Sequence, residues 1–158
     1  MKREIVCYGP SLRKKTKEAF PGEATDKLIK EMREVLREKE GVGLAAPQVG
    51  VLEKVILVDT GEGVVPFLNP VITQESEEKI TTKEGCLSVK GVWLEVERPK
   101  KVTVKAQTQE GDEVEVDAED LMSVIFQHEI DHLNGKLFVD RVGFFKKIRA
   151  IFNYYFRR

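Results

Sequence analysis

The hydrophobic and polar residues of this chain recur with the period of a helix near its start and with patterns typical of strands through its middle. Between positions 25 and 40 the apolar residues recur every three or four positions, which predicts a helix with one buried face. Thr25 or Asp26 can cap its start, and Gly41 can end it. The buried face would carry Leu28, Met32, Val35 and Leu36.

From about position 54 onward, short β-branched runs and, later, alternating apolar and polar residues are typical of strands. The predicted strands cover residues 54–59, 64–73, 92–97, 102–106 and 114–116. Pro66 and Pro70 should bend the second of them, and a turn at 109–112 joins the last two. These short connections favour antiparallel hairpins.

Two further helices are predicted after the strands. Asp117 should cap a helix over about residues 118–133, and another helix covers about residues 144–156. This order of elements predicts an α+β fold. The length of 158 residues, without a repeat or a linker, predicts a single catalytic domain over residues 1–158.

Composition and charge exclude several classes of partner. Hydrophobic residues make up 41% and charged residues 34%, and the net charge of -1 gives no case for DNA as a partner. No apolar run has the length of a signal peptide or a membrane span, so we expect a cytoplasmic protein without a membrane partner. In that reducing compartment Cys7 and Cys86 should not form a disulfide.

The run from His128 to His132, His-Glu-Ile-Asp-His, is the first candidate for chemistry. Residues four apart share one helix face, so both imidazoles can reach one cation, and Glu129 beside them can take a proton from water. The plainer alternative is two ordinary histidines. However, the chain has only these two, and both continue the apolar stripe of the helix, where a polar side chain needs a reason.

Two histidines leave a hydrolytic metal site one ligand short. Downstream of them the only candidate is Asp140, while upstream Cys86 follows Gly85, which permits close approach of the backbone. Alone, Cys86 would more often be a small buried residue. Together with His128 and His132, its thiolate completes a Cys-His-His set with a fourth position open for water.

Residues 41–50 contain three glycines and one uncharged polar side chain, Gln48. This stretch can be a plain helix-to-strand connection. If it lies beside the metal, Gln48 can donate its amide hydrogen to a developing oxyanion, together with a backbone N–H.

Three segments together resemble the peptide deformylases: Gly41–Gln48, Glu84–Ser88 and Gln127–His132. They occur in that family's order and at about its spacing, and Tyr8–Arg13 is similar to its N-terminal stretch. The resemblance covers about residues 5–140. Each motif alone is unspecific, but the three jointly are very specific.

The resemblance implies antiparallel β-sheets around a central metal-binding helix, with an N-terminal and a C-terminal helix. It implies a metal-dependent hydrolase that removes the formyl group from the N-terminal formyl-methionine of nascent polypeptides and releases formate. Cys86, His128 and His132 would bind one divalent metal, most often Fe²⁺, which Ni²⁺, Co²⁺ or Zn²⁺ can replace.

By the same resemblance, Glu129 would act as general base and then general acid. Gln48 and the backbone N–H of Leu87 would hold the formyl oxygen. Gly43 would contact the peptide backbone beside an apolar pocket for the methionine side chain. The residues near that pocket would be Val42, Leu121, Val124, Ile125 and His128.

Ordinary core packing is the alternative for the apolar members of the pocket. Two positions depart from the family pattern: Lys90 stands where proline is usual, and Trp93 stands where many bacterial members carry arginine. Both lie near the substrate cleft in the family, so they bear on the peptide preference beyond methionine.

The predicted C-terminal helix combines an apolar stripe with six basic and no acidic residues between positions 141 and 158. The stripe consists of Phe144, Phe145, Ile148, Ile151, Phe152 and Tyr155. The stripe can pack on its own domain or lie on a membrane surface, or the basic face can meet ribosomal RNA near the exit tunnel. We expect own-domain packing, with which a ribosome contact by the basic face is compatible.

Two rival functions remain at this point. A zincin-like peptidase needs a ligand downstream of His132, and the upstream Cys86 argues against it. A metal-stabilised binding module without turnover should lack the base or the oxyanion donor, yet Glu129 and Gln48 are both present.

Overall fold

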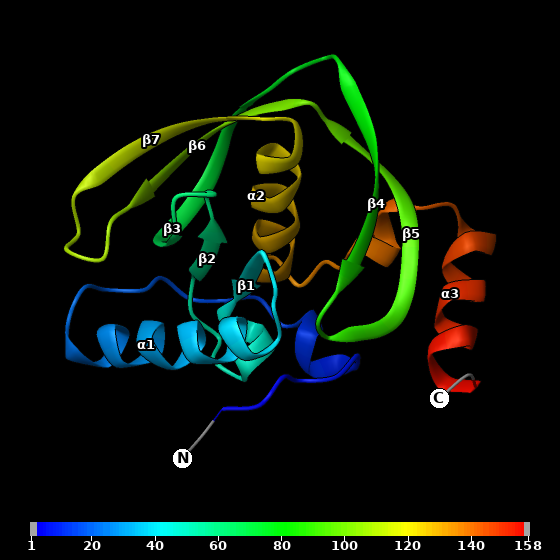
Figure 1. Cartoon of the computed structure of the whole chain (residues 1–158), viewed down its shortest axis with the longest axis horizontal. Coiled ribbons are helices and arrows are strands. Elements are labelled where there is room, and N and C mark those ends of the chain that lie inside the picture. Colours follow the sequence, from blue (N-terminus) through cyan, green and yellow to red (C-terminus); the bar gives the residue numbers. More distant parts are fainter. Residues whose placement is uncertain (1–2, 157–158) are drawn as a thin grey trace.

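The structure is a computed structural model and describes residues 3–156. Helix α2 stands in the middle of the molecule, with one sheet on each side, α1 along the base and α3 at the far edge (Figure 1). The elements in chain order are η1 (Pro10–Arg13), α1 (Glu23–Glu38), β1 (Gly43–Ala45), η2 (Ala46–Val49), β2 (Val55–Asp59), β3 (Val64–Glu75), β4 (Lys79–Cys86), β5 (Val89–Pro99), β6 (Lys101–Gln107), β7 (Glu113–Glu119), α2 (Asp120–Leu133), η3 (Phe138–Arg141) and α3 (Phe144–Phe156).

Every named strand pairs antiparallel, as the short connections predicted. Five strands form one sheet in the order β1-β2-β3-β6-β7, and β4 and β5 form a separate hairpin. The hairpin register shifts between Glu84 and Cys86, where a bulge can redirect a side chain. The α+β prediction, with antiparallel sheets around a central helix, is confirmed.

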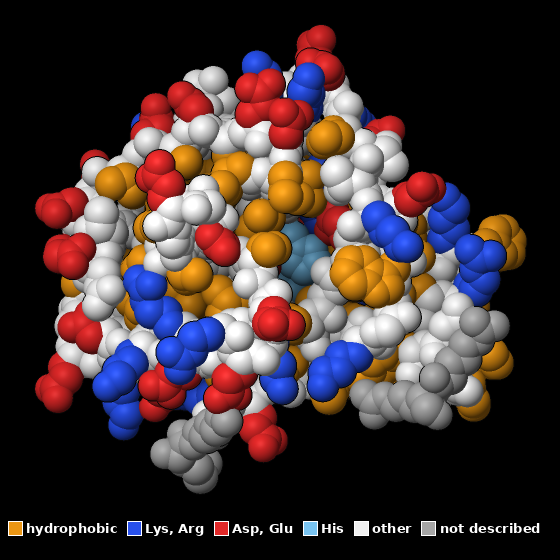
Figure 2. Space-filling view, viewed as in Figure 1, with side chains coloured by type: hydrophobic (Ala, Val, Ile, Leu, Met, Phe, Trp, Pro, Cys, Tyr) orange, Lys and Arg blue, Asp and Glu red, His pale blue; other side chains and the backbone are white. Residues whose placement is uncertain are grey.

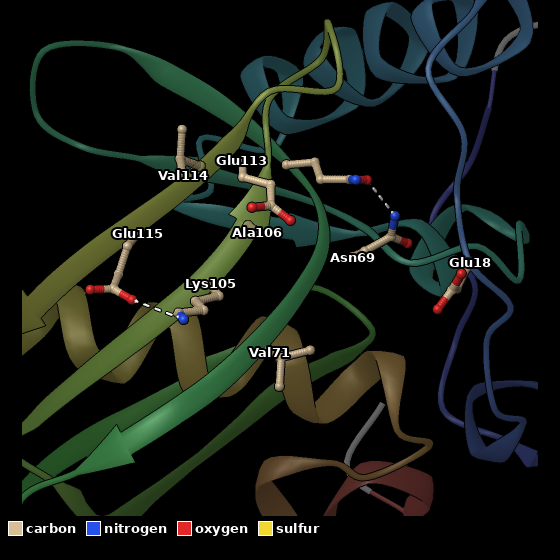
Figure 3. A pocket seen from close by; sticks show the side chains of 9 residues that line it. Glu18, Asn69, Val71, Lys105, Ala106, Glu113, Val114 and Glu115 are labelled. Atoms are coloured by element: carbon tan, nitrogen blue, oxygen red, sulfur yellow. Dashed lines mark hydrogen bonds and ion pairs between the residues drawn. The ribbon is translucent and has the colours of Figure 1, made fainter.

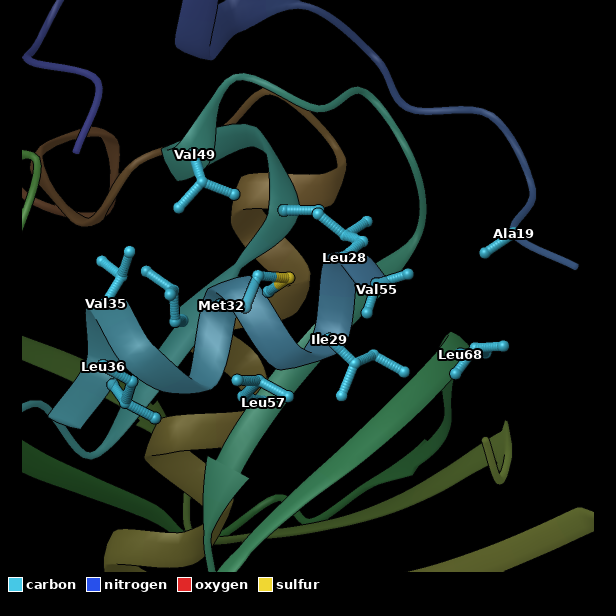
Figure 4. Packing of buried hydrophobic residues seen from close by; sticks show 12 residues of the cluster. Ala19, Leu28, Ile29, Met32, Val35, Leu36, Val49, Val55, Leu57 and Leu68 are labelled. Atoms are coloured by element: carbon cyan, nitrogen blue, oxygen red, sulfur yellow. The ribbon is translucent and has the colours of Figure 1, made fainter. Parts of the chain in front are cut away.

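The apolar face of α1 packs on β2 and the start of β3 (Figure 4). The four residues predicted for this face are all buried, and they meet Leu57 and Leu68 of the sheet. On the other side of β2, Ile125, Phe126 and Ile130 of α2 fill a second cluster. Helix α2 is therefore wedged between the five-stranded sheet and the hairpin, which holds its histidine face in place.

From the sequence, one long strand was missed and one helix cap was placed wrongly. Strand β4 was not predicted, because its residues are mostly polar and its hairpin has a solvated face. Asp117 does not cap α2: it lies in β7, where Thr103 Oγ1 donates a hydrogen bond to its Oδ1 over 2.7 Å. The pairing of β6 with β7 continues to Glu119, so the helix begins only at Asp120.

The expected packing of the α3 stripe is also wrong. Ala150 and Tyr154 are the buried residues of α3, whereas five of the six stripe residues are exposed and Ile151 is half-buried. The contact of α3 with β5 thus uses a different face from the one that hydrophobicity indicated. Among residues 3–156, no helix has the length and the apolar run required to traverse a bilayer.

Candidate metal centre

Three potential ligands from two elements meet beside the middle of α2. The ligand atoms of Cys86, His128 and His132 lie within 4.8 Å of one another. Cys86 stands at the end of β4, just after the bulge, and its Sγ is 3.3 Å from His132 Nε2. Consecutive turns of α2 supply the two imidazoles, so the predicted triad is assembled in space.

Glu84 fixes the orientation of His128. Its Oε2 accepts a 2.9 Å hydrogen bond from His128 Nδ1, which leaves Nε2 of that ring for a cation. Arg98 holds the Glu84 carboxylate through two hydrogen bonds, of 2.6 and 3.0 Å. The carboxylate and the guanidinium are almost completely buried, so this pair is shielded from water.

The same buried charge network reaches the surface. Arg98 also donates to Asp131 over 2.9 Å, and the more exposed Arg141 donates to the same carboxylate over 3.0 Å. Sequence analysis missed all of these supporting residues. Glu84 and Asp131 stand inside the two ligand motifs and could have been suspected, whereas nothing in the sequence pairs Arg98 with them.

Burial lowers the pKa of both histidines, but the neighbouring groups shift the pKa values of the two rings in opposite directions. Burial opposes a charged His128, but hydrogen bonds with Cys86 and Glu84 raise its pKa well above the ordinary value. Burial, and then the charge of His128, lower the pKa of His132 well below the ordinary value. The pocket thus favours a positive charge on the ring between the Cys86 sulfur and the Glu84 carboxylate, and a divalent cation suits such soft and borderline ligands.

Glu129 lies in the same buried space. Burial raises the pKa of its carboxyl to about 7, and its Oε2 has no hydrogen-bond partner among the described residues. Such a carboxyl can exchange a proton near neutral pH. Gly43 makes room for it, because a Cβ at Gly43 would lie 2.5 Å from Glu129 Oε1.

Gln48 is held with its amide nitrogen toward the ligands. Its Oε1 accepts the backbone N–H of Ala45 over 2.9 Å, which determines which way the amide faces. Its Nε2 is then 3.3 Å from Ser88 Oγ and 3.4 Å from Cys86 Sγ. The glycine-rich loop is therefore beside the metal triad, as its functional interpretation required.

A cavity of about 500 Å³ opens beside this group. In Figure 2 a pale blue histidine lies at the bottom of a hollow bordered by orange apolar side chains. All the expected pocket residues line it: Val42, Gly43, Leu121, Val124, Ile125 and His128. Val124 and Ile125 are buried, whereas Val42 and Leu121 are more than half exposed and form the mouth rather than core.

Other expected residues line the same cavity. Leu87 and Gln48 are among them, as are Lys90 and Trp93, the two departures from the family pattern. Trp93 is 62% exposed, and its ring covers Gly85 so closely that a Cβ there would lie 2.8 Å from it. The departures therefore stand on the wall of the cavity, where they can meet a bound peptide.

Asp140 does not complete the metal site. Its carboxylate accepts hydrogen bonds from Arg13, from Lys147 over 2.7 Å and from the backbone N–H of Leu137 over 2.9 Å. It thus ties two distant segments together, and the downstream ligand that a zincin-like peptidase needs is missing from this position.

A second hollow, on the outer face of the large sheet, has a different character (Figure 3). Polar side chains in it pair with one another: Lys105 Nζ lies 3.6 Å from a carboxylate oxygen of Glu115, and the Asn69 amide donates a hydrogen bond to Gln107 over 2.9 Å. None of the buried side-chain atoms without a hydrogen-bond partner among the described residues belongs to it, whereas Glu129 Oε2 is one such atom, so this hollow is not a candidate catalytic site.

Comparison with known proteins agrees with this geometry. The polypeptide deformylase family model matches residues 2–147. A peptide deformylase of Caldicellulosiruptor bescii is 49% identical over 143 residues, which are 89% of this chain and 85% of the relative. One from Halothermothrix orenii is 51% identical over 138 residues, 84% of this chain and 88% of the relative.

Solved structures agree as well. The peptide deformylase of Legionella pneumophila has a TM-score of 0.92 at 36% identity and covers 98% of this chain and 94% of its own. That of Thermotoga maritima has a TM-score of 0.87 at 40% identity, over 90% of this chain and 99% of its own. The chain therefore belongs to the polypeptide deformylase family, the metal-dependent hydrolases that remove the formyl group from the N-terminus of nascent polypeptides.

Proposed function

We propose that Cys86, His128 and His132 hold the metal of this hydrolase and that Glu129 moves the protons of the reaction. The observation that carries the proposal is the meeting of four groups in one buried space: a thiol, two imidazoles and a carboxyl whose pKa is near 7. A divalent cation bound there supplies Lewis acidity toward the formyl carbonyl and lowers the pKa of a water.

Glu129 acts first as a base. Its carboxylate takes a proton from the attacking water, and the oxygen of that water adds to the formyl carbon. The same carboxyl, now protonated, delivers the proton to the leaving amine as the C–N bond breaks. Formate and a free N-terminal methionine remain, so one residue serves both halves of the reaction.

Gln48 and Leu87 stabilise the negative charge that develops on the formyl oxygen. The anchored amide of Gln48 can donate from Nε2, and the backbone N–H of Leu87 is the second donor. Because Ala45 already fixes the amide, little reorganisation is required as the charge develops.

The cavity wall selects the substrate. Val124 and Ile125 offer a buried apolar surface to the methionine side chain, and Val42 and Leu121 offer one at the mouth. Gly43 presents backbone to the peptide. Formyl-methionyl nascent peptides are the substrates that this arrangement fits.

We infer Fe²⁺ as the native metal, with Ni²⁺, Co²⁺ or Zn²⁺ as substitutes. A thiolate and two imidazoles suit all four ions. A thiolate ligand makes the site sensitive to oxidation in every metal form, and Fe²⁺ is itself more readily oxidised than Ni²⁺, so the iron form should lose activity in air faster than the nickel form.

The whole chain, residues 1–158, is proposed to act as one catalytic domain in the cytoplasm. A contact with the ribosome near the exit tunnel, through the basic residues between 141 and 158, is an alternative use of that surface that concerns the basic side chains alone. Co-sedimentation with ribosomes that falls as salt rises would support it, and its absence at low salt would contradict it.

The deciding experiment measures formate release from a formyl-methionyl peptide by anaerobically prepared, nickel-loaded protein. Glu129→Gln should retain the metal and lower kcat by about 10²- to 10⁴-fold. Glu95→Gln, which removes an exposed carboxyl from β5, is the matched control and should keep full activity. Wild-type protein that contains metal but releases no formate would overturn the proposal.

The ligand assignment has its own test. Cys86→Ser should lower the metal content measured by atomic emission, since a serine hydroxyl is a poor ligand for these ions. Cys7→Ser is the control and should bind metal as the wild type does. Equal metal content in both variants would remove Cys86 from the ligand set.

A further inference from the structure

Helix α3 presents an unusually large apolar surface to solvent. Its exposed apolar residues are Phe144, Phe145, Ile148, Phe152, Tyr155 and Phe156. With 100° between successive residues, all six fall within an arc of about 120° on the helix. We call this set the aromatic arc; Phe152 and Phe156 stack at 4.5 Å in it, and Phe144 and Phe145 touch edge to face at 5.7 Å.

The rest of the fold determines which way the aromatic arc faces. Ala150 and Tyr154 lie on the opposite side of α3 and are buried in the cluster formed with β5. Tyr154 also meets the ring of Tyr8 at 5.6 Å, and Lys147 pairs with Asp140. The helix is thus attached by one face, and its six apolar side chains remain at least half exposed, although the ring of Tyr155 also meets Tyr8 at 6.2 Å.

Basic residues border the aromatic arc. Arg149 follows about 20° beyond its edge on the helix and Lys146 about 80° beyond it, and both are exposed. The chain carries no acidic residue between positions 141 and 158, although its net charge is -1. On the neighbouring strand, Glu95 and Glu97 line a hollow together with the first turn of α3, so two carboxylates lie beside this end of the helix.

We propose that α3 binds to the surface of an anionic lipid bilayer, with the aromatic arc in the interface and Lys146 and Arg149 at the headgroups. A helix with aromatic residues on one face and basic residues beside them matches the chemistry of such a surface. Phosphodiester headgroups complement the charge, and the acyl boundary takes up the rings.

Other occupants fit less well. A nucleic acid would satisfy the basic side chains but would leave most of the aromatic arc in water. A second copy packed arc to arc would bring two basic edges together without an acidic residue in either helix to offset them. A lipid surface accommodates both parts of the pattern.

Binding through α3 leaves the catalytic cavity open. The hollow with the histidine lies in the middle of the face shown in Figure 2, and the apolar and basic side chains over α3 gather at its right-hand edge. The enzyme would therefore lie on the bilayer by its side, with the cavity accessible to peptides that emerge near the membrane.

Flotation of the metal-loaded full chain with vesicles tests the proposal. The probes are vesicles of phosphatidylcholine alone, and of phosphatidylcholine and phosphatidylglycerol in about equal parts. We expect at least about tenfold more protein on the anionic vesicles at low salt, with a decrease as salt rises. Wild-type protein that does not float with anionic vesicles would overturn the proposal.

Two paired variants separate the contributions of the helix. Phe145→Ser with Phe152→Ser removes apolar surface, and Lys146→Glu with Arg149→Glu reverses the charge; each should lower anionic vesicle binding about tenfold or more. Phe20→Ser is the matched control, since Phe20 is 74% exposed but lies outside α3. It should bind as the wild type does.

All variants should keep the wild-type circular dichroism spectrum and formate release from a small formyl-methionyl peptide, which excludes unfolding as the cause of lost binding. Sedimentation velocity without lipid identifies a second copy as the occupant: a dimer that the two serines dissociate would overturn the proposal. So would variants that lose ribosome binding while their vesicle binding stays at the wild-type level.

Discussion

Gly43 lies directly beside the carboxyl of Glu129, and its lack of a side chain leaves room for that carboxyl. A Cβ there would lie 2.5 Å from Glu129 Oε1 and 3.0 Å from its Cδ, so the carboxyl would have to move. No positive φ angle requires glycine at this position. The glycine is thus explained by the closeness of the Glu129 carboxyl, the proposed base, in a contact between residues 86 positions apart in the sequence.

Gly43→Ala should therefore harm catalysis more than folding. We expect kcat to fall about 10- to 100-fold, because a displacement of the base by about 1 Å is enough to misalign proton transfer. The melting temperature should fall by no more than a few degrees. Formate release and thermal unfolding are the two measurements.

Gly143→Ala is the control for this substitution, since a Cβ there meets no atom within 4 Å. It should leave both measurements at the wild-type level. An unchanged kcat in Gly43→Ala would show that Glu129 has a second productive position.

At the scale of elements, one buried side chain joins the β4–β5 hairpin to α2. Arg98 of β5 is 1% exposed, and it binds Glu84 of β4 and Asp131 of α2. Glu84 in turn orients His128. The packing of the hairpin on the helix and the orientation of His128, a proposed metal ligand, thus depend on the same guanidinium.

Arg98→Ala leaves two buried carboxylates without their common partner. The free energy of unfolding should fall by about 3–5 kcal/mol. The metal affinity should fall about 10- to 100-fold, because Glu84 no longer holds His128 in place. Urea unfolding and a metal-chelator competition measure the two effects.

Lys79→Ala breaks an exposed ion pair with Glu97 in the same hairpin, which makes it a matched control. Its cost should stay below about 1 kcal/mol, because solvent screens the pair. Equal losses of unfolding free energy in both variants would mean that the burial of Arg98 adds nothing to the strength of its ion pairs.

At the scale of the whole molecule, Asp140 connects the two ends of the described chain. It binds Arg13 of η1 and Lys147 of α3, segments more than a hundred residues apart in sequence. Burial by itself would raise the pKa of Asp140. Hydrogen bonds from Arg13, Lys147 and the Leu137 backbone outweigh the effect of burial and lower the pKa to about 2.

A pKa lower in the folded than in the unfolded state makes stability depend on pH. The contribution of Asp140 is complete above its unfolded pKa of 3.8 and is lost as pH falls toward about 2. Asp140→Asn should thus be less stable than the wild type near neutral pH, by about 1–2 kcal/mol after allowance for solvent screening.

The difference between Asp140→Asn and the wild type should shrink below about pH 4 and approach zero near about pH 2. Urea unfolding at several pH values measures it. A difference that stays constant over this range would show that the carboxylate charge contributes nothing.

The sequence by itself determined the repetitive and the local features of this protein. The four-residue spacing of His128 and His132 requires only helix geometry, and the α1 face requires only an apolar period. The triad could be completed with Cys86 because metal chemistry demands a third ligand. These inferences rest on distances along the chain that covalent geometry already limits.

Only the tertiary structure decided which charges and surfaces meet. The bond of Arg98 to Glu84 and Asp131, the closeness of Gly43 to Glu129 and the connecting role of Asp140 all join residues from separate elements. The outward aromatic arc of α3 is of the same kind. Its hydrophobicity was visible in the sequence, but the side that packs on β5 is the one with the small Ala150, which permits close approach, and with Tyr154, whose ring meets that of Tyr8.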